Sequence, residues 1–182
     1  MLRSPDDLVP DGAPDPLRRF LAYWIDKAAG RTMPAFVDID ATEIPWALSR
    51  LYVVRAVDRG ADFVYRLTGS ELTWNYGFAI AGKRIGDLLA PAAAEGILDC
   101  WRRIVGSPAA YYSVVQHLTT DGMALLGQRV TLPLGPSGGP PDHIIGMTLF
   151  ETIEPRDDLL LEERDVREAR WVELSGPAGM PA

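Results

Sequence analysis

The sequence predicts an α+β fold with a five-stranded antiparallel sheet and small helices on one face. Two β-branched segments, 51–57 and 62–68, flank the short turn Arg59-Gly60-Ala61, which is typical of an antiparallel hairpin. Three more strand patterns follow at 111–120, 125–134 and 144–152. The glycine-punctuated stretch between the two groups has helical spacing instead. This order places the helices as a separate layer on the sheet.

The N-terminal part is expected to contain one helix. Residues 1–14, rich in Pro and Asp, predict a disordered leader. An amphipathic helix over 16–29 follows, because Asp15-Pro16 is a favoured helix start and Gly30 a favoured end. Its apolar residues, called here the N-terminal stripe, recur at helical spacing: Leu17, Phe20, Leu21, Trp24, Ile25 and Ala28. This stripe must be buried on the chain's own sheet or on a second copy, and we predict a homodimer contact there.

The middle and end of the chain complete the expected domain. Ser70 begins a short helix that Gly77 ends, and a longer helix begins near Pro91 and ends at Gly106. Asp121-Gly122 predicts a tight hairpin between two of the later strands. Residues 15–154 should therefore form one domain. Residues 155–182 are expected to form a charged helix, at about 156–173, and a flexible Gly/Pro tail.

Composition argues against several classes of protein. The net charge is −7 over 182 residues without a basic stripe, whereas nucleic-acid binding depends on Lys and Arg at phosphates. The single cysteine, Cys100, permits neither an intrachain disulfide nor a cysteine-rich zinc site. The N-terminus lacks the apolar core of a signal peptide, and no apolar run approaches the roughly 20 residues that cross a bilayer. We expect a cytoplasmic protein with no nucleic-acid partner and no membrane insertion.

Two sets of residues resemble the PAS family. The first lies where PAS domains leave their second strand and build small helices: Leu67-Thr68-Gly69-Ser70-Glu71-Leu72, Tyr76-Gly77, Gly82-Lys83 and Asp87-Leu88-Leu89. The second resembles the signature of a stand-alone bacterial PAS subfamily: Phe20-Leu21-Ala22-Tyr23-Trp24, Lys27, Gly30-Arg31, Met33-Pro34, Asp38-Ile39-Asp40 and Glu43-Ile44-Pro45. Ala41 departs from that signature, which has Pro there. The resemblance covers Leu17 to Phe150 and implies a PAS-like sheet and a sensory or protein-interaction role.

Aromatic and polar residues suggest where a ligand would bind. A cavity between the sheet and the helices could be lined by Tyr65, Trp74, Tyr76, Trp101, Tyr112 and Gln116. Ligand sites combine apolar walls with a few polar groups, but the same residues could simply fill a core. Any ligand is expected between the sheet and the Trp74–Trp101 segment.

We expect no cofactor and no metal. In haem-binding PAS domains the axial histidine usually lies on the longer helix, but His117 and His143 fall outside it. Cys100 lacks the sequence context of the flavin-bonding cysteine in light sensors, so a buried, unreactive thiol is expected. The carboxylates Asp38, Asp40 and Glu43 lack calcium-loop spacing, and Asp40 or Thr42 is expected to cap a turn instead.

These observations predict a non-catalytic PAS-type module in bacterial signalling. It would bind a small apolar or amphipathic ligand, a protein partner, or both. The sequence contains no nucleophile elbow, Walker loop or kinase phosphoacceptor region. Two alternatives remain: a small α+β enzyme with an Asp or His base in a cone-like pocket, and a purely structural dimerisation module.

Overall fold

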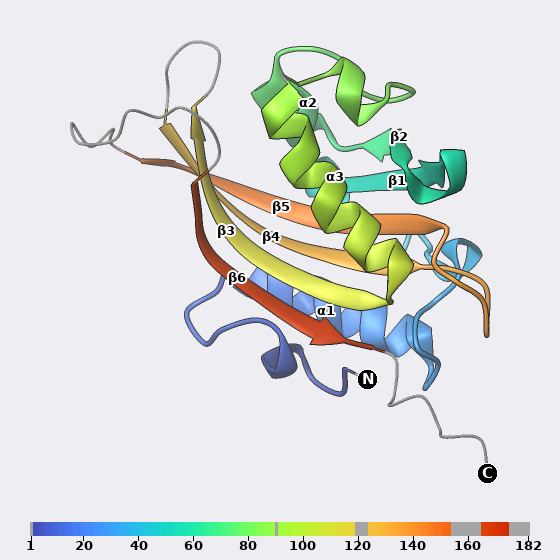
Figure 1. Ribbon diagram of the computed structural model, residues 1–182. Coiled ribbons are helices and arrows are strands. Elements are labelled where there is room, and N and C mark those ends of the chain that lie inside the picture. The colour runs from blue at the N-terminus through green and yellow to red at the C-terminus, as the bar shows by residue number, and fades with distance from the viewer. Residues whose placement is uncertain (1, 90, 119–123, 154–164, 175–182) are drawn as a thin grey trace.

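The computed structural model describes residues 2–89, 91–118, 124–153 and 165–174. One sheet of six antiparallel strands dominates it, in the order β2-β1-β5-β4-β3-β6 (Figure 1). The strands are β1 (Leu51–Val57), β2 (Asp62–Thr68), β3 (Ala109–Leu118), β4 (Ala124–Leu134), β5 (His143–Ile153) and β6 (Asp165–Glu173). The helices are α1 (Asp15–Ala28), α2 (Ser70–Tyr76) and α3 (Pro91–Gly106). The predicted α+β class is confirmed, with six strands rather than five.

The sixth strand replaces part of the predicted C-terminal helix. Residues 165–173 pair with the open edge of β3, so the prediction of a helix there is wrong. An edge strand exposes unpaired N–H and C=O groups, and pairing with β3 satisfies them on one side. Val166, Trp171 and Val172 suit a strand, whereas the many charges of the segment suggested a solvated helix. The hairpin predicted at Asp121-Gly122 lies outside the described residues.

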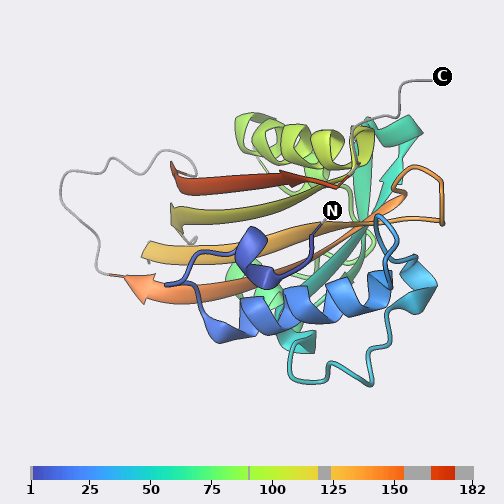
Figure 2. The same ribbon diagram turned by 90° about the horizontal axis from the view of Figure 1, so that it is seen from below.

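Helices cover both faces of the sheet (Figure 2). Helix α1 crosses one face, called here the α1 face, whereas α2 and α3 lie against the other, called here the α3 face. Side chains alternate along each strand, so each face receives every second residue. In β5, for example, Ile145 and Met147 join the α1-face core and Ile144 joins the α3-face core. The ligand site predicted between the sheet and the Trp74–Trp101 segment would therefore lie on the α3 face.

The N-terminal stripe is buried within one chain. Leu17, Phe20 and Leu21 are fully buried against the α1 face, Trp24 is 2% exposed, and Ala28 is also buried. The Trp24 indole N–H donates a hydrogen bond to the Pro133 carbonyl of β4, at 3.1 Å. Ile25 packs at the edge of the same core. The predicted homodimer contact is thus corrected, because the sheet already occupies the surface it would need.

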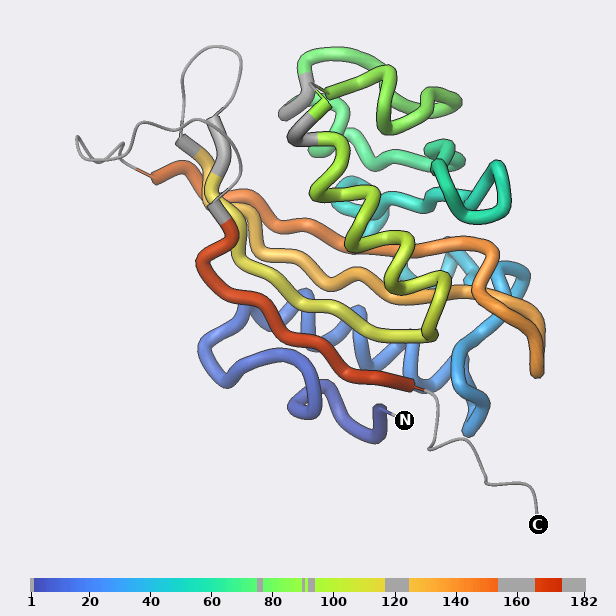
Figure 3. The backbone as a smooth tube through the Cα atoms, viewed as in Figure 1, coloured from blue at the N-terminus to red at the C-terminus, as the bar shows by residue number. Residues whose placement is uncertain are grey.

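The predicted disordered leader is also folded. Leu2, Leu8, Val9 and Ala13 belong to the α1-face core, and Leu8 is fully buried. A capped 3-10 turn at Pro5–Asp7 brings the segment back alongside α1 (Figure 3). Its few apolar residues gain contacts only when α1 and the sheet are in place, which a local reading of composition misses.

The signature-like residues of the N-terminal segment form a structural network. Arg31 pairs with Asp38 at 2.7 Å, and Lys27 pairs with Glu43. A backbone hydrogen bond from Ala35 and the Arg31 guanidinium lower the pKa of Asp38.

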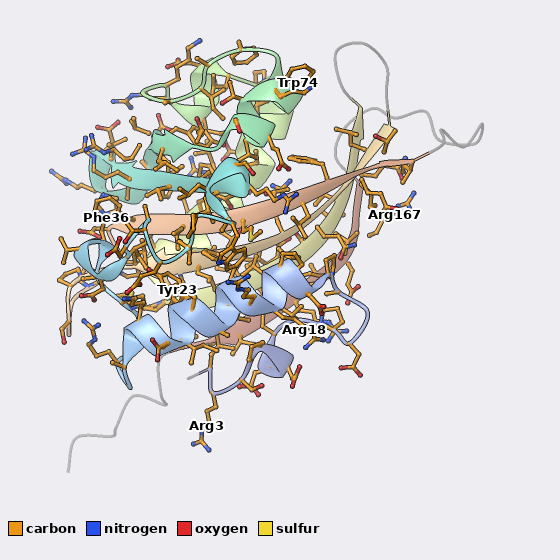
Figure 4. The ribbon with its side chains drawn as sticks, turned by 180° about the vertical axis from the view of Figure 1, so that it is seen from behind. Arg3, Arg18, Tyr23, Phe36, Trp74 and Arg167 are labelled. Atoms are coloured by element: carbon orange, nitrogen blue, oxygen red, sulfur yellow. The ribbon has the colours of Figure 1, made fainter. Side chains whose placement is uncertain are left out.

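Asp40 caps the following turn, as predicted. Its carboxylate accepts hydrogen bonds from the Thr42 N–H and hydroxyl, at 2.8 and 2.7 Å. The Asp40 backbone N–H donates to the Tyr23 hydroxyl at 2.9 Å. These contacts explain the carboxylate cluster as a set of turns and ion pairs on the outer side of α1, where Tyr23 lies (Figure 4).

None of the helices described is long and apolar enough to cross a membrane.

Candidate functional site

A row of polar side chains crosses the middle of the α3 face. Ser113 of β3 lies directly opposite Arg129 of β4, and Arg129 lies opposite Thr148 of β5. Their flanking residues, such as Tyr112 and Val130, enter the α1-face core, so the row itself faces α3. Ser113 and Thr148 are each 1% exposed, and Arg129 is partly buried. Polar residues at the centre of a buried face need a reason, because burial of an unpaired polar group costs free energy.

Aromatic residues lie on both sides of this row, toward β1 and β2 and toward β6. The Trp101 ring of α3 lies 6.0 Å from Tyr52, 5.3 Å from Phe63 and 5.7 Å from Tyr65, measured between ring centroids. Tyr111 of β3 packs on Trp171 of β6 at 4.2 Å. The α3 face therefore combines aromatic walls with a polar centre, a composition typical of small-molecule sites.

Tyr52 connects the aromatic group to the sheet. Its hydroxyl lies 2.9 Å from the Thr131 hydroxyl, so both groups are paired. Burial raises the pKa of Tyr52 to about 12, although the positive charge of Arg129 acts in the opposite direction. Tyr52 is therefore neutral at physiological pH, and its ring packs with those of Tyr65 and Trp101.

Arg129 is a cation without a counter-ion among the described residues. Its Nε atom is buried and has no hydrogen-bond partner, and neither has the Ser113 Oγ atom opposite. Burial raises the pKa values of Tyr52, Cys100 and Tyr111, and the positive charge of Arg129 partly opposes this effect at all three residues. The described ion pairs leave Arg129 out, although the arginines Arg102 and Arg103 of α3 both take part in them.

The structure brings together only part of the predicted ligand site. Tyr65 and Trp101 are buried neighbours on the α3 face. Tyr112 enters the α1-face core, and Gln116 shares that face by strand alternation, so placing them at the site was wrong. Trp74 is 84% exposed and projects from α2 at the rim of the molecule (Figure 4). Tyr76 ends α2, and its side chain lies outside the described ones.

Sequence reasoning missed Tyr52, Ser113 and Arg129. The sequence did contain a pattern that places Arg129, because Val130, Leu132 and Leu134 form one apolar face of a strand. Strict alternation then assigns Arg129 to the opposite face.

The residues weighed as cofactor ligands have ordinary roles where they are described. Burial raises the pKa of the Cys100 thiol to about 12, so it is protonated and unreactive at neutral pH. His143 lies at the start of β5, where its Nδ1 atom is 2.8 Å from an Asp142 carboxylate oxygen and its ring stacks on Phe36. His117 lies in β3. Across the described ranges, no three His, Cys, Asp or Glu side chains converge as metal ligands.

The chain is similar to several known proteins. A family model described as a PAS domain matches residues 13–149, well over half of the chain. The light-state structure of the blue-light photoreceptor Aureochrome1 LOV matches at 15% identity and a TM-score of 0.41, covering 62% of this chain and 88% of that one. The PAS domain of Bordetella pertussis BvgS matches at 21% identity and a TM-score of 0.44, covering 65% and 87%. No curated protein matches the sequence. On the extent of the family match, the chain belongs to the PAS domain family.

Proposed function

We propose that this chain is a non-catalytic, ligand-sensing module of bacterial signalling that works in the cytoplasm. The family supports a sensory or interaction role. The observation that carries ligand binding is the buried Ser113 hydroxyl, which has no partner at hydrogen-bond distance among the described residues and lies on a face rich in aromatic side chains. Most buried polar groups are hydrogen-bonded, so a buried hydroxyl without a close partner favours a bound ligand that supplies the hydrogen bond.

The ligand would lie between the α3 face and the segment that includes α2 and α3. Trp101 would contact its apolar part, because this side chain is the aromatic centre of that layer. Binding changes a protein's conformation only through different affinities for two arrangements. The two arrangements proposed here are α3 packed closely on the sheet and α3 displaced by the guest.

Strand β6 offers a route from the site to the surface. The Arg103 guanidinium of α3 lies 3.9 Å from the centre of the Trp171 ring in β6. Arg103 and Ser107 also contact the Glu173 carboxylate, each at 3.2 Å. A shift of α3 would therefore move the end of β6. We propose that a protein partner or a second copy binds at this end of β6. The N-terminal stripe cannot serve as that surface, because it is buried against the sheet.

The enzyme alternative receives less support. It needs an Asp or His base inside the pocket, and the buried polar residues described on both faces are Ser113, Gln116, Thr131 and Thr148. None of these is a general base at neutral pH.

Native mass spectrometry of protein purified from its own organism or a bacterial host tests the proposal. A co-purified small molecule, released under denaturing conditions, is the expected result. Hydrogen exchange with that molecule added back should then protect α3 and β6. Protection confined to the loop at 135–142, with α3 unchanged, would place the ligand elsewhere and refute the proposed site.

A further inference from the structure

We infer that the ligand of the α3 face is a small carboxylic acid whose carboxylate is held by Arg129 and Ser113. This inference rests on the proposed ligand-sensing function and adds the chemical class of the ligand. Its basis is a partly buried arginine at the middle of the sheet, whose Nε atom is shielded from solvent without a hydrogen bond, directly opposite the buried Ser113 hydroxyl.

The charge of Arg129 is the first step. Guanidinium groups remain ionised in proteins, so the site carries one positive charge at any physiological pH. Burial of a polar atom without a hydrogen bond costs free energy, and the Nε atom of Arg129 is shielded from solvent without one. A ligand anion supplies the missing partner.

The position of Ser113 is the second step. Residues directly opposite in antiparallel strands have Cβ atoms roughly 5 Å apart on the same face. Ser113 and Arg129 are such a pair, and the serine hydroxyl is buried, near the Tyr111 side chain but without a partner at hydrogen-bond distance among the described residues. A hydroxyl donor beside a guanidinium fork can bind two oxygens of one planar group, the geometry that a carboxylate offers.

The surroundings favour a single negative charge over a phosphate. Arg103, the next cation, is paired with Glu173 and stacked on Trp171. The remaining neighbours are neutral at physiological pH, including Tyr52, whose pKa is about 12, and the protonated Cys100. A doubly charged group would leave one charge buried and uncompensated, at a large cost.

The body of the acid is set by the adjacent row of the sheet. Tyr111, Thr131 and Tyr52 occupy that row, and Trp101 lies above it. An aromatic ring or a short aliphatic chain would contact these side chains once its carboxylate is at Arg129.

Isothermal titration calorimetry with matched acids and amides tests the inference. Phenylacetate and hexanoate are the probes, and phenylacetamide and hexanamide are their neutral counterparts. We expect the acids to bind about 10- to 100-fold more tightly than the amides, the range of one charge-assisted hydrogen-bonded pair. Arg129→Met should abolish this preference, and Ser113→Ala should reduce it.

Arg55→Met is the control, because Arg55 is an exposed arginine on β1 and its loss should leave affinity unchanged. The thermal midpoint of each variant establishes that it folds. Equal binding of acids and amides, or an unchanged preference in Arg129→Met, would overturn the carboxylate inference and leave the ligand-sensing function standing. No binding by any acid or amide up to about 5 mM, a range that detects even weak complexes, would count against both.

Discussion

The Tyr52 and Thr131 hydroxyl groups lie 2.9 Å apart, although β5 runs between the strands that carry them. Gly146 of β5 makes this possible, because it is the residue opposite both Tyr52 and Thr131. A Cβ atom at position 146 would lie 2.2 Å from the Tyr52 ring. The tyrosine therefore lies across a glycine and joins two strands that are not neighbours.

Gly146→Ala should displace Tyr52 and destabilise the protein. Overpacking of this kind costs about 1–3 kcal/mol in the free energy of unfolding, which urea denaturation measures. Gly96→Ala is the matched control, since its added methyl on α3 meets nothing within 4 Å. There the substitution should stabilise the helix by roughly 0.5–1 kcal/mol. Equal effects at the two positions would contradict the packing described for Tyr52.

Trp24→Ala should destabilise the fold of the chain. The side chain is buried, and its N–H donates to the Pro133 carbonyl, so we expect a loss of about 3–5 kcal/mol, the usual range for a buried aromatic. Val37→Ala, at an 87% exposed residue, should change stability by less than about 0.5 kcal/mol. A variant at Trp24 that keeps its stability but changes its mass in light scattering would restore the dimer-contact hypothesis.

The two tryptophans of the predicted ligand site should behave differently. Trp101→Ala removes the centre of the α3-face aromatic group and should cost about 3–5 kcal/mol. Trp74→Ala should leave the denaturation midpoint almost unchanged, within about 0.5 kcal/mol, because Trp74 is exposed. Similar losses at both positions would mean that α2 packs its tryptophan inward in solution.

Leu8→Ala should destabilise the protein although it lies in the leader. Leu8 is fully buried in the α1-face core, and removal of such a side chain costs about 2–5 kcal/mol. Asp11→Ala in the same segment is the control, since the side chain of Asp11 is fully exposed. A disordered leader would give no difference between the two variants in urea denaturation.

Alkaline pH should weaken the fold through Tyr52. Folding raises the pKa of this residue from 10.0 to about 12, so the native state holds the proton more tightly than the unfolded chain. The stabilisation is complete below pH 10 and is lost as the pH rises toward 12. Tyr52→Phe lacks the ionising group, so its stability should decline less steeply over this interval. Parallel declines in urea denaturation would show that Tyr52 ionises as freely in the native state as in the unfolded one.

The ligand-site prediction failed at the level of strand register. The sequence presents Tyr111, Tyr112, Ser113 and Gln116 within one strand, and choosing among them requires knowing which face is which. The prediction placed Tyr112 and Gln116 at the ligand site, yet both side chains lie on the α1 face of the sheet. Because the side-chain period is two, a choice of the wrong face inverts every residue of the strand. Pairing of β3 with β4 resolves it, since Val130 and Leu132 lie in the α1-face core.

The sequence by itself determined the α+β class, the bounds of β1 and β2, the helices at the N-terminus and before β3, and the PAS resemblance. These features depend on local periodicity and capping, which act over a few residues. Tertiary structure alone decided the partner of the N-terminal stripe, the packing of the leader, the sixth strand and the position of Arg129 opposite Ser113. Each of these depends on contacts between residues far apart in the chain: α1 with β4, residues 165–173 with the edge of β3, and Arg129 with Ser113 across a ladder. Such contacts form only when the sheet has assembled, so no window of neighbouring residues contains them.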